Sequence, residues 1–157
     1  MIKVFFIDVD GTLTDGNIYI GENGEVFKAF NVKDGLGLKK LIKNGIIPIL
    51  ITGRKSKIVE YRCNELGIYN LYQGVDDKKL LIEKIVKEKE ISFENTAFIG
   101  DDENDLEAMK VCSLTFAPND AVKKVREYVD IVLTSKSGEA PVREAIEYIL
   151  EKCDNIH

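Results

Sequence analysis

DVDGTLTDG, residues 8–16, is the stretch that decides the fold of this chain. The run before it, 2–7 (IKVFFI), is nearly all apolar and rich in β-branched and aromatic residues, which predicts a strand buried on both faces. The strand ends at Asp8 and Asp10, and in open α/β sheets ligands bind at that end. Asp-Gly is also common turn chemistry. Two like charges side by side nevertheless call for a cation or a shared proton, so this stretch is the first candidate site.

Length and composition exclude several classes of protein. The 157 residues, 45% hydrophobic and 31% charged, predict a single globular domain spanning 1–157. A net charge of -5 disfavours a nucleic-acid partner, and no apolar run is long enough for a membrane span. The N-terminus shows no secretion signal and the three cysteines lack metal-type spacing, which together predict a cytoplasmic protein with reduced thiols. The only histidine, His157, is terminal, so histidine triads and histidine zinc sites are excluded.

A β-hairpin is expected directly after the opening stretch. Asn23-Gly24 lies between two strand-like runs, 18–20 and 26–30, and this dipeptide is a strong hairpin signal. The resulting flap, 17–30, carries more apolar residues than a solvated hairpin needs. It is therefore expected to pack either against a neighbouring subunit or against its own domain.

The rest of the chain alternates between strand and helix patterns. Strands are expected at 46–51, 70–72, 96–99, 113–117 and 131–133, and helices at 34–44, 56–66, after 74–79 to about 90, up to 111, 120–127 and 140–151. This alternation predicts a parallel sheet with right-handed crossovers. The expected fold class is α/β, a Rossmann-like, three-layer, doubly wound sheet.

Polar residues follow several of these strands, at the sheet edge where ligands bind. Each has an ordinary alternative explanation as a helix cap, a solvated lysine or a favourable charge at a helix start. Together they form a hard oxygen site suited to Mg²⁺, with a hydroxyl and a lysine suited to a phosphoryl group. Without an available histidine, an aspartate is the plausible nucleophile. The residues are Asp8, Asp10, Thr52, Lys78, Asp101, Asp102 and Asp105.

These segments resemble the four ordered motifs of haloacid dehalogenase-like phosphatases. The matching strings are DVDGT at 8–12, TGR at 52–54, Lys78, and GDDxxD at 100–105. The resemblance implies that Asp8 is the nucleophile and that Asp10 is the general acid and base.

The same resemblance implies the metal ligands and the phosphate-binding groups. Mg²⁺ would be held by Asp8, the carbonyl of Asp10 and Asp101, with support from Asp102 or Asp105. Thr52, Gly53 and a lysine would bind the phosphoryl group. The spacing from Gly74 favours Lys78 over its neighbour Lys79.

Longer strings resemble the 3-deoxy-D-manno-octulosonate 8-phosphate phosphatases, which lack a cap domain and form tetramers. The strings are 8–16, 30–37 and 52–67, and the intervals between the motifs leave no room for a cap. The resemblance implies a homotetramer and a sugar-acid phosphate substrate, whose carboxylate suits Arg54 and Arg62. The tail and helix at 137–157 begin with a segment, 137–144, similar to one that approaches a neighbour's site.

Other functions remain open at this point. Phosphatases of nine-carbon acid sugar phosphates share much of the pattern. A signalling receiver domain would need its aspartate after the third strand, where this chain has 70–72 (NLY). A non-catalytic module is disfavoured because it would have no reason to retain clustered carboxylates.

Overall fold

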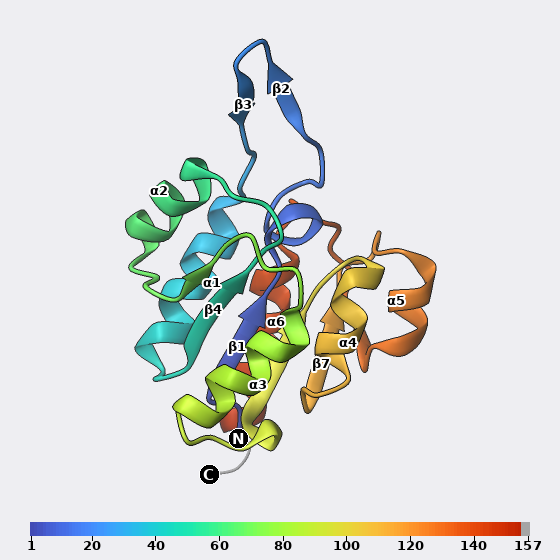
Figure 1. Ribbon diagram of the computed structural model, residues 1–157. Helices are drawn as coiled ribbons and strands as arrows, with labels where there is room; N and C mark the ends of the chain where they lie inside the picture. Colours follow the sequence, from blue (N-terminus) through green and yellow to red (C-terminus); the bar gives the residue numbers. More distant parts are fainter. Residues whose placement is uncertain (155–157) are drawn as a thin grey trace.

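Six parallel strands form one central sheet in the computed structural model, which describes residues 1–154 (Figure 1). The strand order is β5-β4-β1-β6-β7-β8, so the first strand lies in the middle, between β4 and β6. The strands are β1 Val4–Ile7, β4 Ile47–Ile51, β5 Leu71–Tyr72, β6 Thr96–Ile99, β7 Leu114–Ala117 and β8 Ile131–Val132. All five pairings are parallel, which confirms the predicted doubly wound sheet.

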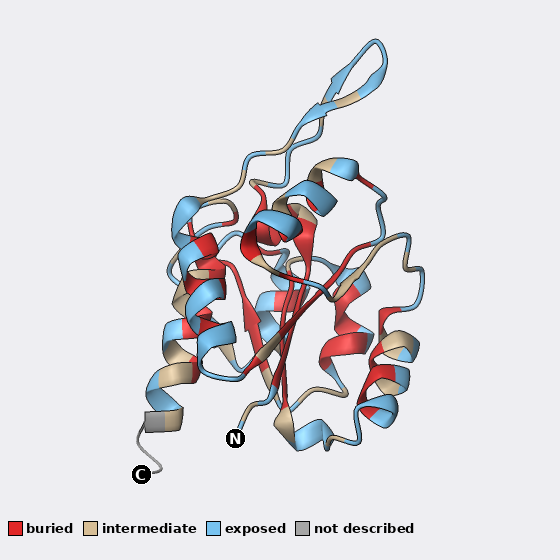
Figure 2. Cartoon of the chain, turned by 90° about the vertical axis from the view of Figure 1, so that its left-hand side faces the viewer, coloured by how far each residue is buried: buried red, intermediate tan, exposed pale blue. Residues whose placement is uncertain are grey.

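Helices cover both faces of the sheet and complete a three-layer fold. They are α1 Val32–Lys43, α2 Lys57–Leu66, α3 Lys78–Glu88, α4 Leu106–Met109, α5 Lys123–Tyr128 and α6 Pro141–Asp154. Phe5 and Ile7 face the cluster that α1, α2 and α6 cover, whereas Val4 and Phe6 face the one under α3, α4 and α5. The central strands β1 and β6 are fully buried between these layers (Figure 2), whereas the edge strands β5 and β8 are partly exposed. The length and apolarity that a bilayer span requires are not found in any helix of the described residues.

Short turns link several of these elements. Residues Val9–Leu13 wind into a tight turn after β1, and single 3₁₀ turns form at Phe93–Asn95 and Glu103–Asp105. The helix predicted at 34–44 begins two residues earlier, because the side chain of Asn31 accepts a hydrogen bond from Lys33 N and caps it. Leu36 of α1 and Leu80 of α3 are exposed.

The predicted hairpin is present and projects beyond the carboxyl edge of the sheet (Figure 1). It consists of β2 Tyr19–Gly21 and β3 Gly24–Phe27, a shorter ladder than 17–30, with an irregular register at Tyr19 and Ile20. Tyr19 stacks on Phe27 with the ring centroids 4.2 Å apart. Ile20 and Val26 remain 71% and 58% exposed. The alternative that the flap buries these apolar side chains on its own domain is therefore wrong.

Candidate active site

Three carboxylates from separate segments converge at the carboxyl edge of the sheet. Asp8 follows β1, Asp101 follows β6, and Asp105 lies in the 3₁₀ turn Glu103–Asp105. One oxygen atom from each lies within 4.8 Å of the others. The sheet register explains this, since Ile7 is paired with Ile99 and Asp8 N donates to the carbonyl of Ile99 at 3.0 Å. Parallel neighbouring strands thus bring distant acids to one point.

Glycine at position 11 allows the turn after Asp8 to pass close to Asp101. Gly11 has φ +82°, a left-handed conformation that side chains other than glycine rarely adopt. A Cβ at this position would lie 2.0 Å from Asp101 Oδ2. The Asp-Gly pair in the motif is therefore a steric requirement of the cluster.

Burial and mutual repulsion shape the electrostatics of these acids. Burial, reinforced by the nearby charge of Asp8, raises the pKa of Asp101 to about 9. Burial likewise raises the pKa of Asp105 to about 6, against the opposing effect of Lys78. A divalent cation would relieve this repulsion, and a set of carboxylate oxygens is the donor type that Mg²⁺ prefers. The residues present therefore fit a magnesium ion.

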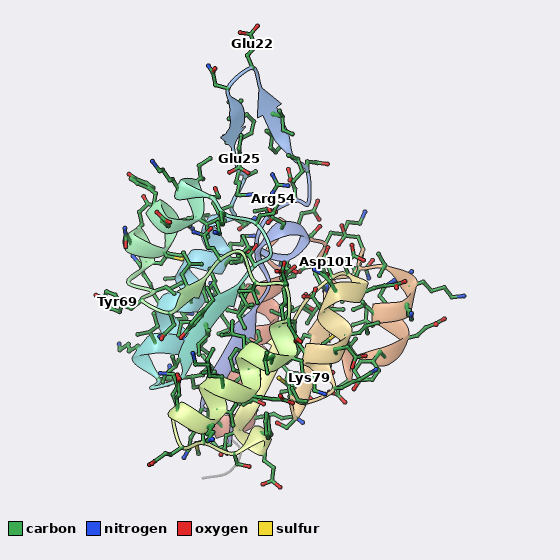
Figure 3. The ribbon with its side chains drawn as sticks, in the orientation of Figure 1. Glu22, Glu25, Arg54, Tyr69, Lys79 and Asp101 are labelled. Atoms are coloured by element: carbon green, nitrogen blue, oxygen red, sulfur yellow. The ribbon has the colours of Figure 1, made fainter. Side chains whose placement is uncertain are left out.

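Lys78 is the cation buried beneath the cluster. Its Nζ lies 2.7 Å from Asp8 Oδ1 and 2.7 Å from Asp105 Oδ1, and its side chain is 2% exposed. Burial alone would lower the pKa of Lys78, but the charges of Asp8 and Asp105 raise it above its usual value. Lys79 is 43% exposed, pairs with Glu83 and lies away from Asp101 (Figure 3). Position thus distinguishes the two lysines in favour of Lys78.

Asp10 faces a different set of groups from Asp8. Asp10 Oδ1 lies 2.5 Å from Lys28 Nζ, and Thr52 Oγ1 donates to Asp10 Oδ2 at 3.4 Å. Arg54 N in turn donates to Thr52 Oγ1 at 3.4 Å. The carboxylate of Asp10 is therefore directed toward the second predicted motif and the hairpin, and it is not among the clustered metal-type oxygens.

An open pocket of about 210 Å³ joins these groups. It is lined by Asp8, Asp10, Thr52, Gly53, Arg54, Asp101, Asp102 and Asn104. Arg54 lies near the root of the hairpin, above Asp101 in Figure 3. The structure thus places two of the four motifs directly around Asp8, with Lys78 beneath it.

Two predicted site residues, Arg62 and Asp102, have local partners of their own. Arg62 lines a separate small cavity between α1 and α2, with its guanidinium 5.8 Å from the Phe30 ring centroid, and does not line the pocket of Arg54. Within this chain Arg54 and Arg62 therefore line different pockets, and a role of Arg62 in binding the substrate carboxylate stays a prediction. The Asp102 carboxylate accepts from Glu103 N at 2.7 Å, so it caps a turn while Asp105 joins the cluster.

The segment 137–144 packs against the chain's own turn after β1. Gly138 N donates to the carbonyl of Thr12 at 3.4 Å, and Ser137 Oγ donates to Asp120 Oδ2 at 2.8 Å. A Cβ at Gly138 would lie 2.8 Å from the Cα of Asp15. This segment therefore supports its own turn, while 155–157, the end of the predicted tail, lies outside the described residues.

Lys28 and Asn104 are site residues that the motif analysis missed. Lys28 lies in the run 26–30 (VFKAF), where an isolated lysine among apolar residues is the one available signal. Its distance from Asp10 in the sequence conceals the contact, which arises only when the hairpin returns to the sheet edge. Asn104 lies between Asp102 and Asp105 of the fourth motif and lines the pocket. Spacing alone does not show which way its side chain points.

Comparison with known proteins agrees with this geometry. Residues 67–146 match the family model of the haloacid dehalogenase-like hydrolases. The 3-deoxy-D-manno-octulosonate 8-phosphate phosphatase of Salmonella typhi is 41% identical over 95% of this chain and 79% of its own length. The solved structure of the enzyme of that name from Yersinia pestis has a TM-score of 0.95 at 40% identity, covering 98% of this chain and 83% of its own.

A second solved structure contains ligands. It is the 3-deoxy-D-manno-octulosonate 8-phosphate phosphatase of Moraxella catarrhalis, in complex with a magnesium ion, a phosphate ion and a KDO molecule. It has a TM-score of 0.92 at 41% identity and covers 96% of this chain and 86% of its own. The carboxylate cluster, the buried lysine and these similarities lead to one assignment: the chain belongs to the haloacid dehalogenase-like hydrolases and is a phosphatase, a phosphoric monoester hydrolase.

Proposed function

We propose that this protein is a Mg²⁺-dependent phosphatase that hydrolyses 3-deoxy-D-manno-octulosonate 8-phosphate through an aspartyl-phosphate intermediate. The observation that carries the proposal is the convergence of Asp8, Asp101 and Asp105 on one point, with Lys78 2.7 Å from Asp8. The names and ligands of the similar proteins support the choice of metal and substrate.

In the first step the Asp8 carboxylate attacks phosphorus. A bond forms between an Asp8 oxygen and phosphorus, and the bond from phosphorus to the sugar oxygen breaks. Lys78 and the hydroxyl of Thr52 compensate the negative charge of the phosphoryl oxygens. Asp8, Asp101 and Asp105 would hold Mg²⁺, which supplies further charge neutralisation when bound.

Asp10 carries the proton in both halves of the reaction. It donates a proton to the departing sugar oxygen, which leaves as an alcohol. It then removes a proton from water, whose oxygen attacks phosphorus and breaks the bond to Asp8. Inorganic phosphate leaves, Asp8 is again a carboxylate and Asp10 is again protonated. The position of Asp10 beside Asp8, with its carboxylate in the same pocket, supports this division of roles.

Substrate selection is assigned to the mouth of the pocket. The guanidinium of Arg54 suits the carboxylate of a sugar acid because it offers paired donors in a fixed plane. The pocket encloses the reacting end and stays open above it, so an eight-carbon and a nine-carbon acid sugar phosphate can both be accommodated. The nine-carbon 9-phosphate is therefore the second candidate substrate.

A substrate panel tests the proposed function. Phosphate release is measured from 3-deoxy-D-manno-octulosonate 8-phosphate, from a nine-carbon acid sugar 9-phosphate, and from glucose 6-phosphate, which lacks the carboxylate. We expect kcat/KM to be highest for the eight-carbon acid, and about tenfold or more lower for glucose 6-phosphate because the Arg54 contact is lost. Removal of Mg²⁺ with EDTA should abolish release, and added Mg²⁺ should restore it. Highest turnover of the nine-carbon ester would refute the assigned substrate.

The exposed apolar hairpin predicts assembly into a homotetramer. Ile20, Val26 and Phe27 are exposed on a projection that a single chain leaves uncovered. Replacing residues 19–27 by a short Gly-Ser linker should reduce the assembly to smaller species, measured by light scattering coupled to size-exclusion chromatography. The matched control is Leu36→Ser, which removes an exposed apolar side chain from α1. An unchanged mass after hairpin replacement would remove the hairpin from the interface.

Cellular location is proposed from the cysteines. Cys63, Cys112 and Cys153 are free thiols. Burial raises the pKa of Cys63 to about 11 and that of Cys112 to about 12, so both remain as unreactive thiols. Free thiols are typical of a reducing compartment, which supports a cytoplasmic enzyme.

A further inference from the structure

Lys28 of the hairpin makes a close contact with Asp10 that no motif accounts for. Lys28 Nζ lies 2.5 Å from Asp10 Oδ1, and the lysine side chain is only 2% exposed although the hairpin itself is solvated. The other side-chain partner of the Asp10 carboxylate in the described part of the chain is Thr52, at a longer 3.4 Å. Lys28 is therefore the group that restricts the direction of the Asp10 carboxylate most strongly.

Lys28 is itself held in place by a chain of contacts. Glu25 Oε2 lies 3.0 Å from Lys28 Nζ, and Ser56 Oγ donates to Glu25 Oε1 at 2.5 Å. Ser56 also caps α2, because its Oγ accepts from Ile58 N at 3.2 Å. Glu25 belongs to β3, and its side chain reaches toward the sheet edge, near Arg54 (Figure 3). The ammonium group is thus fixed between the hairpin and the start of α2.

We propose that Lys28 is a positioning residue, which holds the Asp10 carboxylate toward the oxygen of the leaving group. The inference rests on the proposed function, in which Asp10 transfers the proton. Lys28 acts through Asp10 and is not among the residues that line the pocket. The hairpin therefore supplies a component of proton transfer in addition to its exposed apolar surface.

The geometry separates this role from simple stabilisation of the hairpin. A cation required only to hold the hairpin could pair with Glu25 alone, yet Lys28 contacts both carboxylates at once. Loss of the orientation of Asp10 should slow the reaction, because a misplaced proton donor stabilises the transition state little. Replacement of Lys28 should therefore lower activity in the same way as replacement of Asp10, but to a smaller extent.

Two esters with different leaving groups test the proposal. A sugar alkoxide needs a proton as it leaves, whereas p-nitrophenolate leaves without one. kcat/KM reports the steps up to departure of the leaving group, so later attack by water does not contribute. We expect Lys28→Met to lower kcat/KM about 100-fold for the sugar phosphate and less than about threefold for p-nitrophenyl phosphate. Asp10→Asn should show the same pattern at larger size, and Lys28→Arg should recover much of the activity.

Controls separate positioning from structure and from the proposed function. Lys39→Met changes an exposed lysine of α1 and should leave both esters unaffected. In an Asp10→Asn background, Lys28→Met should have almost no further effect on the sugar phosphate. Equal losses on both esters, or a full additional loss in that background, would overturn the role of Lys28. Failure of the wild-type enzyme to hydrolyse the sugar phosphate would instead refute the proposed function.

Discussion

Replacement of Asp8 by Asn is expected to abolish phosphate release and leave the fold intact. The amide cannot attack phosphorus or form the acyl phosphate, so kcat should fall by about 10⁴-fold or more. The side chain retains its size, and the change removes one charge from a cluster in which burial already raises the pKa of Asp101 to about 9. The substitution removes one of the two buried partners of Lys78, which keeps its ion pair with Asp105, and it also removes a charge near Asp101, so stability in the absence of metal should change little.

Three measurements test this prediction. Phosphate release is followed with the sugar phosphate at saturating Mg²⁺, and thermal unfolding is followed by circular dichroism. The variant should also bind Mg²⁺ more weakly in a calorimetric titration, because one oxygen ligand is lost. The matched control is Glu103→Gln, which changes a nearby exposed acid that belongs neither to the pocket lining nor to the carboxylate cluster. Near-normal turnover by Asp8→Asn would reject the assigned nucleophile.

Replacement of Lys78 by Met is expected to impair both stability and activity. Lys78 is the buried partner of Asp8 and Asp105, and its removal leaves those carboxylates facing one another without a cation. Breaking a buried ion pair from one side costs about 3–5 kcal/mol of unfolding free energy. Phosphate release should fall by at least about 100-fold, because in the proposed function Lys78 compensates the charge of the phosphoryl oxygens.

Metal rescue distinguishes the electrostatic cause of this loss from a packing defect. Urea unfolding of Lys78→Met should show low stability in EDTA and partial recovery in excess Mg²⁺, since a cation that binds only the folded state stabilises it. Activity should not recover with stability. Lys79→Met is the matched control, because the exposed Lys79 pairs only with Glu83 on the helix surface. Equal effects of the two substitutions would exclude the specific role of Lys78.

The amino-acid sequence by itself determined the fold class and the convergence of Asp8 and Asp101. An unbroken apolar run before Asp8, and similar runs at 46–51 and 96–99, specify buried parallel strands. In such a sheet every strand ends at the same edge, so residues that follow strands meet there wherever they lie in the chain. This rule alone brings Asp8 and Asp101 together.

Only the tertiary structure decided which neighbour of each ambiguous pair faces the site. Lys78 is buried and Lys79 is exposed because one helical step rotates the side chain by about 100°. Asp105 joins the cluster while Asp102 caps a turn, for the same kind of reason. Arg62 turns toward Phe30, and Lys28 reaches Asp10 across 18 residues through the return of the hairpin. Strand ends follow from a repeating local pattern, whereas these contacts depend on the path of a loop and the rotation of a helix, which spacing along the chain does not encode.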